Sequence, residues 1–413
     1  MSKDDAPVGQ SRPLTPEPTP EGERIQTLDY LRGIAVMGIL GANIIAFGHP
    51  VIAGVLPQAF LTDPNDPGSF LLLVQFVLID GKMRTLFTLL FGAGLWLFFE
   101  RARQRGEGTL LAVRRLGLLA LAGLMHFHLL WEGDILLAYA LCGLVALLFI
   151  GVPARDQLIL GLLGYTLGAA FYGLQYGGAY AMELGNFANA GTPSPDDGRA
   201  AELIMSGDYA GFVANNVTAR ALDPFSQLWV NSSETLPLIL MGMALMRLGF
   251  FERGFGVRWS GTIGLAAIMS GGLLTLGIGL WMRATQFDLY ATFLAHVSLT
   301  ALPRLAIALG LIALLATWSP RWNGWLAQRV RAAGRAAFTN YIGTSFVMLF
   351  VFHGWALGLF GMLSRPQLYI VAALGCVAML VWSKPWLERF RYGPLEWLWR
   401  CLTYGRWFAL RRS

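Results

Sequence analysis

The stretch GLMHFHLLWEGD, residues 123–134, places two histidines and two carboxylates in an otherwise apolar region. The candidates are His126, His128, Glu132 and Asp134. Histidine suits proton transfer because its unperturbed pKa lies near neutrality, and a nearby carboxylate can orient the ring. Positions two apart on a helix point about 200° away from each other, so the two histidines cannot face one cavity. This spacing also disfavours a metal site.

More polar residues are expected at the same depth as this stretch. Ionisable groups inside a membrane need a partner or water, which makes them functional candidates by default. We therefore predict a polar pocket that opens to the outer side, with these further members: Asn43, His49, Asp80, Lys82, Arg84, Asn231, Glu234, His296 and His353. Two simpler interpretations remain open: Asp80, Lys82 and Arg84 form a self-neutralising ion pair at a helix start, and Asp134 caps the next helix.

A second candidate site lies at the opposite, inner side. In the segment TLDYLRG, residues 27–33, Thr27 or Asp29 can cap a helix start, and Arg32 follows within about one turn. Arg32, together with Arg114 and Arg115, could hold phosphate groups. The alternative is that these arginines only determine how the chain is oriented in a membrane.

Positioning these residues requires a membrane fold. The 413-residue chain is 55% hydrophobic and only 14% charged, whereas soluble domains carry roughly 25% charged residues. Apolar runs of about 17–25 residues fit the hydrocarbon core of a bilayer. We predict an all-α polytopic membrane bundle of about ten transmembrane helices, at residues 33–48, 82–99, 112–130, 134–150, 157–176, 226–246, 259–281, 293–317, 338–360 and 367–383. The apolar stretch 69–79 is too short to span and is expected to be interfacial or re-entrant.

The basic residues predict the orientation of the bundle. With both ends inside, 24 of the 31 lysines and arginines fall in inner segments and four in outer loops, as the positive-inside rule requires. We therefore expect N-in and C-in topology in a bacterial plasma membrane, surrounded by lipid. The net charge of +6 is explained by these loops, so no nucleic-acid partner is predicted.

The chain is expected to divide into three parts. Residues 1–23 are polar and proline-rich and are predicted to be a disordered cytoplasmic tail. Residues 24–383 form the bundle, with a small outer cap at about residues 177–225. Residues 384–413 alternate aromatic and basic residues, which predicts an amphipathic cytoplasmic segment in the membrane interface.

Five ordered blocks resemble the YeiB-like bacterial membrane family, catalogued as domain of unknown function 418. They span residues 24 to about 410 and read RIQTLDYLRGIAVMGILGANI, GKMRTLFTLLFGAGLWL, RRLGLLALAGLMHFHLLWEGDILLAYALCG, GRAAFTNYIGTS and YGPLEWLWRCLTYGR. The third block matches the family pattern at His126, Asp134 and Tyr139, but His128 does not belong to that pattern.

This family is similar to the transmembrane acyltransferases, which include lysosomal heparan glucosaminide acetyltransferase and bacterial sugar O-acetyltransferases. The shared D-x-x-R-G opening is Asp29, Arg32 and Gly33 here. The resemblance implies a bundle in which cytosolic acyl-CoA delivers its acyl group to an acceptor on the far side. It also implies that Asn43 is an active-site residue, whereas His49 lies closer to that asparagine than the corresponding histidine does in the glucosaminide enzyme.

Three functions are compatible with these observations, and we rank acyl transfer from acyl-CoA to a small-molecule or glycan acceptor first. In that hypothesis Asn43 binds the oxyanion, Asp134 or Glu132 orients the base, and Arg32 with Arg114 or Arg115 attracts the CoA phosphates. The base is a histidine, in order of preference His126, then His353 or His49. A small-molecule or lipid transporter with proton-coupling sites at Asp80 or Glu234 ranks second, although no inverted repeat is evident. A non-catalytic scaffold or sensor ranks third. A homodimer is compatible with such folds.

Overall fold

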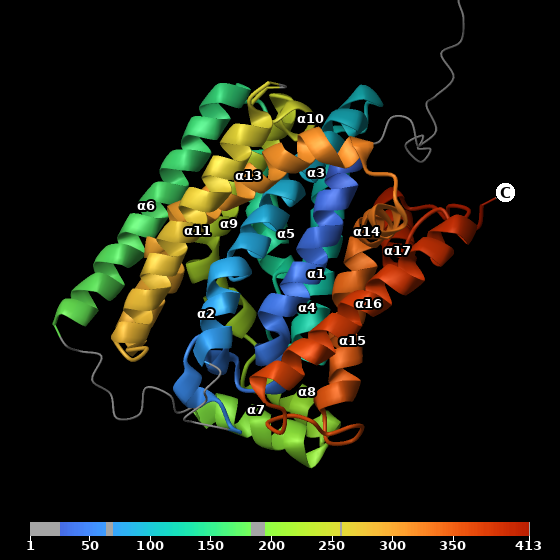
Figure 1. Ribbon diagram of the computed structural model, residues 1–413. Helices are drawn as coiled ribbons and strands as arrows, with labels where there is room; N and C mark the ends of the chain where they lie inside the picture. Colours follow the sequence, from blue (N-terminus) through green and yellow to red (C-terminus); the bar gives the residue numbers. More distant parts are fainter. Residues whose placement is uncertain (1–24, 63–68, 183–194, 257, 413) are drawn as a thin grey trace, which may run out of the picture.

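The computed structural model describes residues 25–62, 69–182, 195–256 and 258–412, and it is an all-helical bundle (Figure 1). No β-strand forms within these residues. The predicted disordered tail, residues 1–23, lies outside the described residues. The long helices are α1 (Gln26–Gly48), α3 (Lys82–Gln104), α4 (Gly108–Leu129), α6 (Ala154–Ala181), α9 (Asp223–Arg247), α11 (Ser260–Ala284), α13 (Ala301–Trp318) and α16 (Arg365–Arg389).

Shorter helices fill the remaining positions. The interior ones are α2 (Ser69–Leu78), α5 (Leu136–Leu147), α12 (Leu289–Phe293), which continues as a π-helical segment at Leu294–Leu299, α14 (Trp325–Arg335) and α15 (Ala337–Phe352). The peripheral ones are α7 (Pro195–Ser206), α8 (Tyr209–Thr218), α10 (Phe250–Arg253) and α17 (Pro394–Tyr404).

Membrane-like helices account for much of the bundle. Within the described residues, six helices are long and apolar enough to cross a membrane: α1, α4, α6, α11, α13 with its short extension to Arg321, and α16. The other predicted spans coincide with α3 and α9, which carry charged side chains, and with α5 and α15, which have only 12 and 16 residues. Each of the ten predicted segments thus overlaps a helix, and the count of ten spans stays a prediction.

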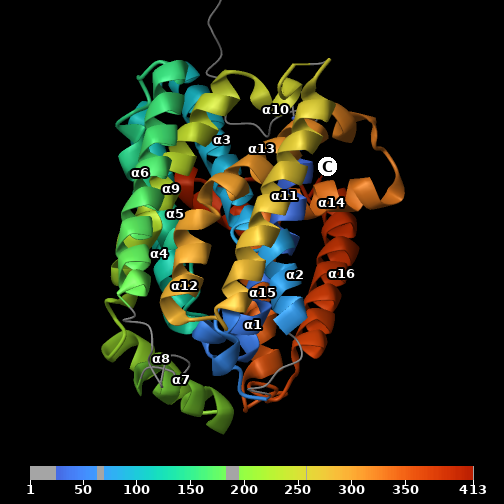
Figure 2. The ribbon, with the colours of Figure 1, turned by 60° about the vertical axis from the view of Figure 1, so that its left-hand side comes forward.

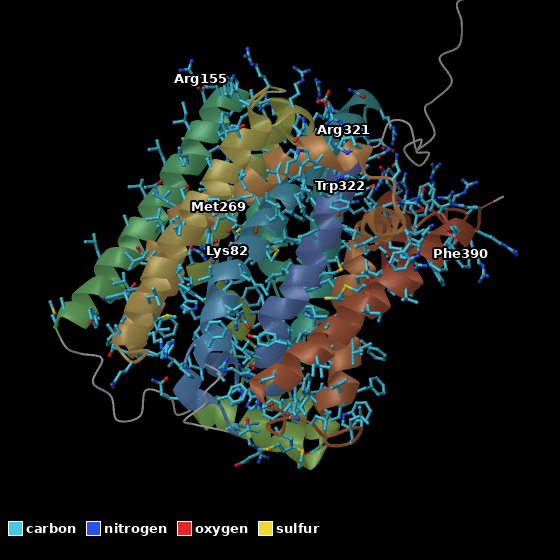
Figure 3. All side chains as sticks on the ribbon, viewed as in Figure 1. Lys82, Arg155, Met269, Arg321, Trp322 and Phe390 are labelled. Carbon is cyan, nitrogen blue, oxygen red and sulfur yellow. The ribbon has the colours of Figure 1, made fainter. Side chains whose placement is uncertain are left out.

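The two ends of the bundle differ in their residues. Helices α7 and α8 cover one end, which we call the cap end (Figures 1 and 2). Arg155 and Arg321 lie at the opposite end, which we call the arginine end (Figure 3). Lys82, by contrast, lies within the bundle, between these two ends (Figure 3).

The outward faces of several long helices are apolar. Leu167 and Leu174 of α6 and Leu273 of α11 are 64–80% exposed, and Met269 projects from α11 in Figure 3. A soluble protein rarely exposes apolar patches of this extent. Lipid tails would cover such side chains without cost, so the exterior is that of a membrane protein.

Close glycine contacts position α1 at the centre of the bundle, where it packs against α3, α14, α15 and α16. A Cβ atom on Gly33 would lie 2.1 Å from the Val330 carbonyl oxygen, and one on Gly334 would lie 1.8 Å from the Asp29 carbonyl oxygen. Only glycine permits this approach of α1 and α14, as small residues do in membrane helix pairs generally. The glycine of the D-x-x-R-G motif therefore brings Arg32 next to α14.

The amphipathic C-terminal segment predicted at residues 384–413 begins within α16 and includes α17. Helix α17 contacts α4 and α15. The outer cap predicted at about residues 177–225 includes α7 and α8 as well as residues 183–194, which lie outside the described residues.

Candidate active site

His126 forms the centre of a buried hydrogen-bonded relay. Its Nδ1 atom lies 2.9 Å from Asp134 Oδ1, and its Nε2 atom lies 2.8 Å from Ser345 Oγ. The His126 and Asp134 side chains are 0% and 2% exposed, and Ser345 is 2% exposed. Three separate elements supply these groups: the last turn of α4, the loop before α5, and the middle of α15. A base held by a carboxylate on one side and a hydroxyl on the other is the arrangement that activates an oxygen nucleophile.

Asp134 both caps a helix and belongs to the relay. Its Oδ2 atom accepts a hydrogen bond of 2.9 Å from the Leu137 amide in the first turn of α5, while its Oδ1 atom faces His126. The geometry is compatible with both interpretations that the sequence left open, because each carboxylate oxygen has its own partner. Gly123 makes this possible, since a Cβ atom there would lie 2.8 Å from Asp134 Oδ2.

The second histidine of the motif points elsewhere, as the helical angle predicts. His128 Nδ1 bonds to the Leu124 carbonyl oxygen of its own helix at 2.8 Å. This separates His128 from the relay and makes it a matched control for His126.

A small void next to the relay brings Asn43 into the site. The void has a volume of about 10 Å³ and is lined by Asn43 of α1 and by Tyr341, Thr344 and Ser345 of α15, among apolar residues. The Tyr341 ring is also centred 5.2 Å from the His126 ring. A side-chain amide beside a serine hydroxyl can donate to a developing oxyanion.

A larger cavity leads from this region toward the arginine end. It has a volume of about 240 Å³, and Tyr341 lines both this cavity and the void beside Ser345. Leu136 and Tyr139 line it as well, and Arg32, Arg115 and other residues complete its wall. We call it the channel.

The channel adjoins a second cavity of about 310 Å³, which we call the arginine vestibule. Six residues line both cavities, so the two are contiguous; they are Arg32, Gly94, Arg115, Gly334, Arg335 and Glu396. The vestibule is strongly basic, and its arginines are Arg32, Arg101, Arg105, Arg115, Arg335, Arg391 and Arg400. Guanidinium groups are well suited to phosphate because they donate planar, charge-assisted hydrogen bonds.

The structure separates the two neighbouring arginines that were predicted to bind phosphate. Arg115 lines the channel and the vestibule, and its guanidinium lies 3.7 Å from the centre of the Trp399 ring. Arg114 is exposed on the side of α4 that faces Gly405 and lines neither cavity. Adjacent helical positions differ by about 100°, which accounts for the difference. Asp29 lines the vestibule and pairs with Arg32 at 3.5 Å.

Glu396 of α17 joins the channel wall to the start of α15. Its Oε1 atom accepts hydrogen bonds from the Phe338 and Thr339 amides at 2.7 and 3.0 Å, and its Oε2 atom accepts one of 2.5 Å from Thr339 Oγ1. Burial raises the pKa of this carboxyl above its usual range. Glu396 thereby holds the helix that carries Tyr341 and Ser345.

The other predicted catalytic residues lie toward the cap. His49, Glu132 and His353 line a cavity of about 40 Å³ with Phe212 of α8. His49 bonds through both ring nitrogens, to the Leu363 carbonyl oxygen at 3.0 Å and to the Leu61 amide at 3.2 Å. Glu132 pairs with Arg220, next to the cap helices. The His353 ring packs against the rings of Tyr209 and Phe212, which belong to α8.

Four of the predicted pocket residues lie apart from the relay, in polar contacts that link α2, α3, α9 and α13; they are Asp80, Lys82, Arg84 and Glu234. Arg84 Nη2 lies 2.5 Å from Glu234 Oε2, and Arg304 Nη2 lies 3.8 Å from Glu234 Oε1. Asp80 accepts a hydrogen bond of 2.8 Å from Gln75, and Lys82 donates to the Phe76 carbonyl oxygen. The partner of Arg84 is therefore Glu234, a residue of another helix.

Comparison with known proteins identifies the family. The chain is 31% identical to the uncharacterized protein YeiB of Escherichia coli K12, over 92% of this chain and 96% of that protein. It is 29% identical to the uncharacterized protein YxaH of Bacillus subtilis 168, over 96% and 98% of the two chains. The profile described as protein of unknown function (DUF418) matches residues 245–406. The chain belongs to the YeiB-like DUF418 family.

The DUF418 profile matches the part of the chain that supplies Ser345, Tyr341, Arg335 and Glu396 to the site. None of these four was predicted. Ser345 and Tyr341 lie in the block GRAAFTNYIGTS, where a serine and a tyrosine four apart share one helix face, and this was the available signal. No solved structure matches this member of the family.

Proposed function

We propose that this chain is a membrane acyltransferase that passes an acyl group from acyl-CoA, bound at the arginine end, to an acceptor that enters from the cap end. The observation that supports it best is the continuity of the site: a vestibule with seven arginines opens into a channel, and the channel ends at Tyr341 beside the buried His126 relay. The proposal includes ten spans, cytosolic termini and a bacterial inner-membrane location.

The two ends of CoA match the two cavities. Its phosphate groups would bind among the vestibule arginines, where charge-assisted hydrogen bonds are strong. Its thioester arm would lie in the channel, between the vestibule and Tyr341. A hydroxyl or amine on the acceptor would lose its proton to His126, which Asp134 orients through Nδ1. Asn43 would donate to the oxyanion. No metal is required by this chemistry.

Binding of CoA is the first test. We expect purified protein in detergent to bind CoA and acetyl-CoA, measured by calorimetry, and Arg32→Gln or Arg335→Gln to weaken binding about 10- to 100-fold, since each removes a charge-assisted hydrogen bond. The matched control is Arg155→Gln, an exposed arginine at the same end that lines neither cavity. Wild-type protein that binds neither compound would contradict the proposal.

Transfer is the second test. Labelled acetyl-CoA is supplied with hydroxylamine as a small acceptor, and release of free CoA is followed. The rate without enzyme is subtracted, because hydroxylamine also cleaves thioesters in solution. We expect His126→Ala to lower the rate about 100- to 10,000-fold, the contribution of a positioned general base, and His128→Ala to change it little, because His128 bonds within its own helix. Equal loss in both variants would point to a structural role for α4.

A transporter is the second candidate, and the buried charged cluster favours it. Arg84, Glu234 and Arg304 form ion pairs inside the bundle, and buried ionisable groups often mark a solute path. In proteoliposomes, a transporter would accumulate solute under a proton gradient, and Glu234→Gln would stop that accumulation. An acyltransferase would show no such dependence on the gradient.

A further inference from the structure

The Ser345 hydroxyl has a different kind of hydrogen-bond partner from many other hydroxyl side chains in the helices. Thr344 donates to the Asn340 carbonyl oxygen of its own helix at 2.6 Å, and Ser270 of α11 donates to Ala267 in the same way at 3.3 Å. This is the ordinary pattern for hydroxyl side chains in helices. Ser345 Oγ instead lies 2.8 Å from Nε2 of His126, which is 219 positions away in the sequence. The contact therefore depends on how α15 packs against α4.

The three groups are arranged in the order that nucleophilic catalysis requires. The carboxylate of Asp134 lies on Nδ1 of His126, and the Ser345 hydroxyl lies on Nε2, both at hydrogen-bond distance. Such a triad is recognised by its geometry and not by the order of its residues in the chain. A fully buried carboxylate and imidazole are also costly in an apolar bundle.

The surroundings of Ser345 supply the other parts of an acylation site. The void beside its hydroxyl is also lined by Asn43, which brings an amide donor close to the serine. Tyr341 stands one helical turn before Ser345 and lines both this void and the channel. The channel that would carry the thioester therefore ends one side chain away from the serine.

We propose that Ser345 carries the acyl group covalently between the two substrates. This inference rests on the proposed function, because it assumes that acyl-CoA is the donor. It divides the reaction into two half-reactions, each with one substrate in the site, so that the donor from the arginine end and the acceptor from the cap end need not meet.

In the first half-reaction, Ser345 Oγ attacks the thioester carbonyl carbon while His126 Nε2 takes the hydroxyl proton. The tetrahedral oxyanion accepts a hydrogen bond from the Asn43 side-chain amide. When the carbon–sulfur bond breaks, the CoA sulfur receives the proton from His126, and an ester on Ser345 remains. In the second, His126 takes a proton from the acceptor hydroxyl, whose oxygen attacks the ester carbonyl. Ser345 Oγ leaves and regains that proton, so no oxidant or further reactant is needed.

The test begins with the acyl-enzyme itself. Purified protein is mixed with acetyl-CoA without an acceptor, quenched within seconds in acid and analysed by intact-protein and peptide mass spectrometry. We expect one added acetyl group, mapped to Ser345, that disappears when hydroxylamine is supplied. Ser345→Ala and His126→Ala should show no adduct, whereas the controls Ser270→Ala and His128→Ala should show it. Ser345→Cys should form a thioester instead, which hydroxylamine cleaves at neutral pH.

Rates separate this inference from the proposed function. With hydroxylamine as the acceptor, we expect Ser345→Ala to lower the enzyme-catalysed rate of CoA release about a thousandfold or more. The variant should still bind CoA. A variant that binds CoA and transfers at the wild-type rate would overturn the covalent step and leave a direct transfer to the acceptor. A wild-type protein that binds no CoA would instead overturn the proposed function. A fluorophosphonate probe, which reacts with activated serines, tests Ser345 without CoA. It should label Ser345 in the wild-type protein and not in His126→Ala. If neither this label nor the acetyl adduct is found, the inference is overturned.

Discussion

At the scale of single residues, Asp134 shows how one carboxylate can hold both a helix and a base. One oxygen accepts the Leu137 amide and the other faces His126 Nδ1. A backbone cap keeps the carboxylate in one orientation, so the imidazole beside it is held as well. Loss of the oxygen that accepts the Leu137 amide should therefore lower stability, whereas loss of the oxygen that faces His126 should lower the reaction rate.

We expect Asp134→Asn to reduce acyl transfer about 1,000- to 10,000-fold with little loss of stability. The amide oxygen can still cap α5, but its NH₂ group then faces Nδ1 and forces the His126 proton onto Nε2, which can no longer accept the Ser345 proton. Transfer rate and thermal unfolding in detergent measure the two effects. Asp288→Asn makes the same change at the residue that accepts the Ala291 amide at the start of α12, and it should leave the rate unchanged. A variant with normal transfer would show that Asp134 is only a cap.

At the scale of elements, the crossing of α1 and α14 determines the shape of the vestibule. Gly33 and Gly334 let the two backbones touch, and this places Arg32 and Arg335 on the wall shared by both cavities. The motif D-x-x-R-G therefore combines a charge with the glycine that positions it.

Gly334→Ala should damage both stability and CoA binding. A Cβ atom at this position would lie 1.8 Å from the Asp29 carbonyl oxygen, so α14 must move away from α1. We expect a loss of about 1–3 kcal/mol of stability, as for overpacking, and weaker CoA affinity because Arg335 moves with the helix. Thermal unfolding and calorimetry measure these. Gly272→Ala in α11, where a Cβ meets nothing within 4 Å, is the control and should be neutral or stabilising.

At the scale of the whole molecule, the site extends along the bundle from one end toward the other. The vestibule lies at the arginine end, the relay lies beyond Tyr341, and α7 and α8 cover the far end (Figures 1 and 2). In a membrane, this layout would keep a cytosolic donor and an external acceptor on opposite sides. The orientation of the chain is therefore part of the proposed mechanism.

Cysteine labelling can test that orientation. In a variant without Cys142, Cys376 and Cys401, a membrane-impermeant maleimide should label Ser206→Cys of α7 in intact cells and Arg155→Cys only after lysis, because arginine-rich segments stay inside. Labelling at both cysteines before lysis would contradict the proposed topology. Labelling of Arg155→Cys in intact cells and of Ser206→Cys only after lysis would show the opposite orientation.

The amino-acid sequence by itself determined the class of fold and pointed to two of the three relay residues. Apolar runs interrupted by arginine-rich segments require a helical membrane protein, since a bilayer core satisfies no backbone group from outside. The third block pointed to His126 and Asp134, which are close in the chain and so can be placed together by one helix end and one short loop. The helical angle alone separated His126 from His128.

Only the tertiary structure decided which distant side chains join them. Ser345 meets His126 across 219 positions, and Arg335, Arg391 and Arg400 meet Arg32 and Arg115 at one vestibule. In the tertiary structure Arg114 lines neither cavity, and Glu132 pairs with Arg220. The physical reason is that the spacing of polar residues along a helix indicates which face is polar. It does not indicate which other helix that face contacts. That choice depends on close backbone contacts such as Gly33 and Gly334, which bring two helices together only when the whole bundle packs.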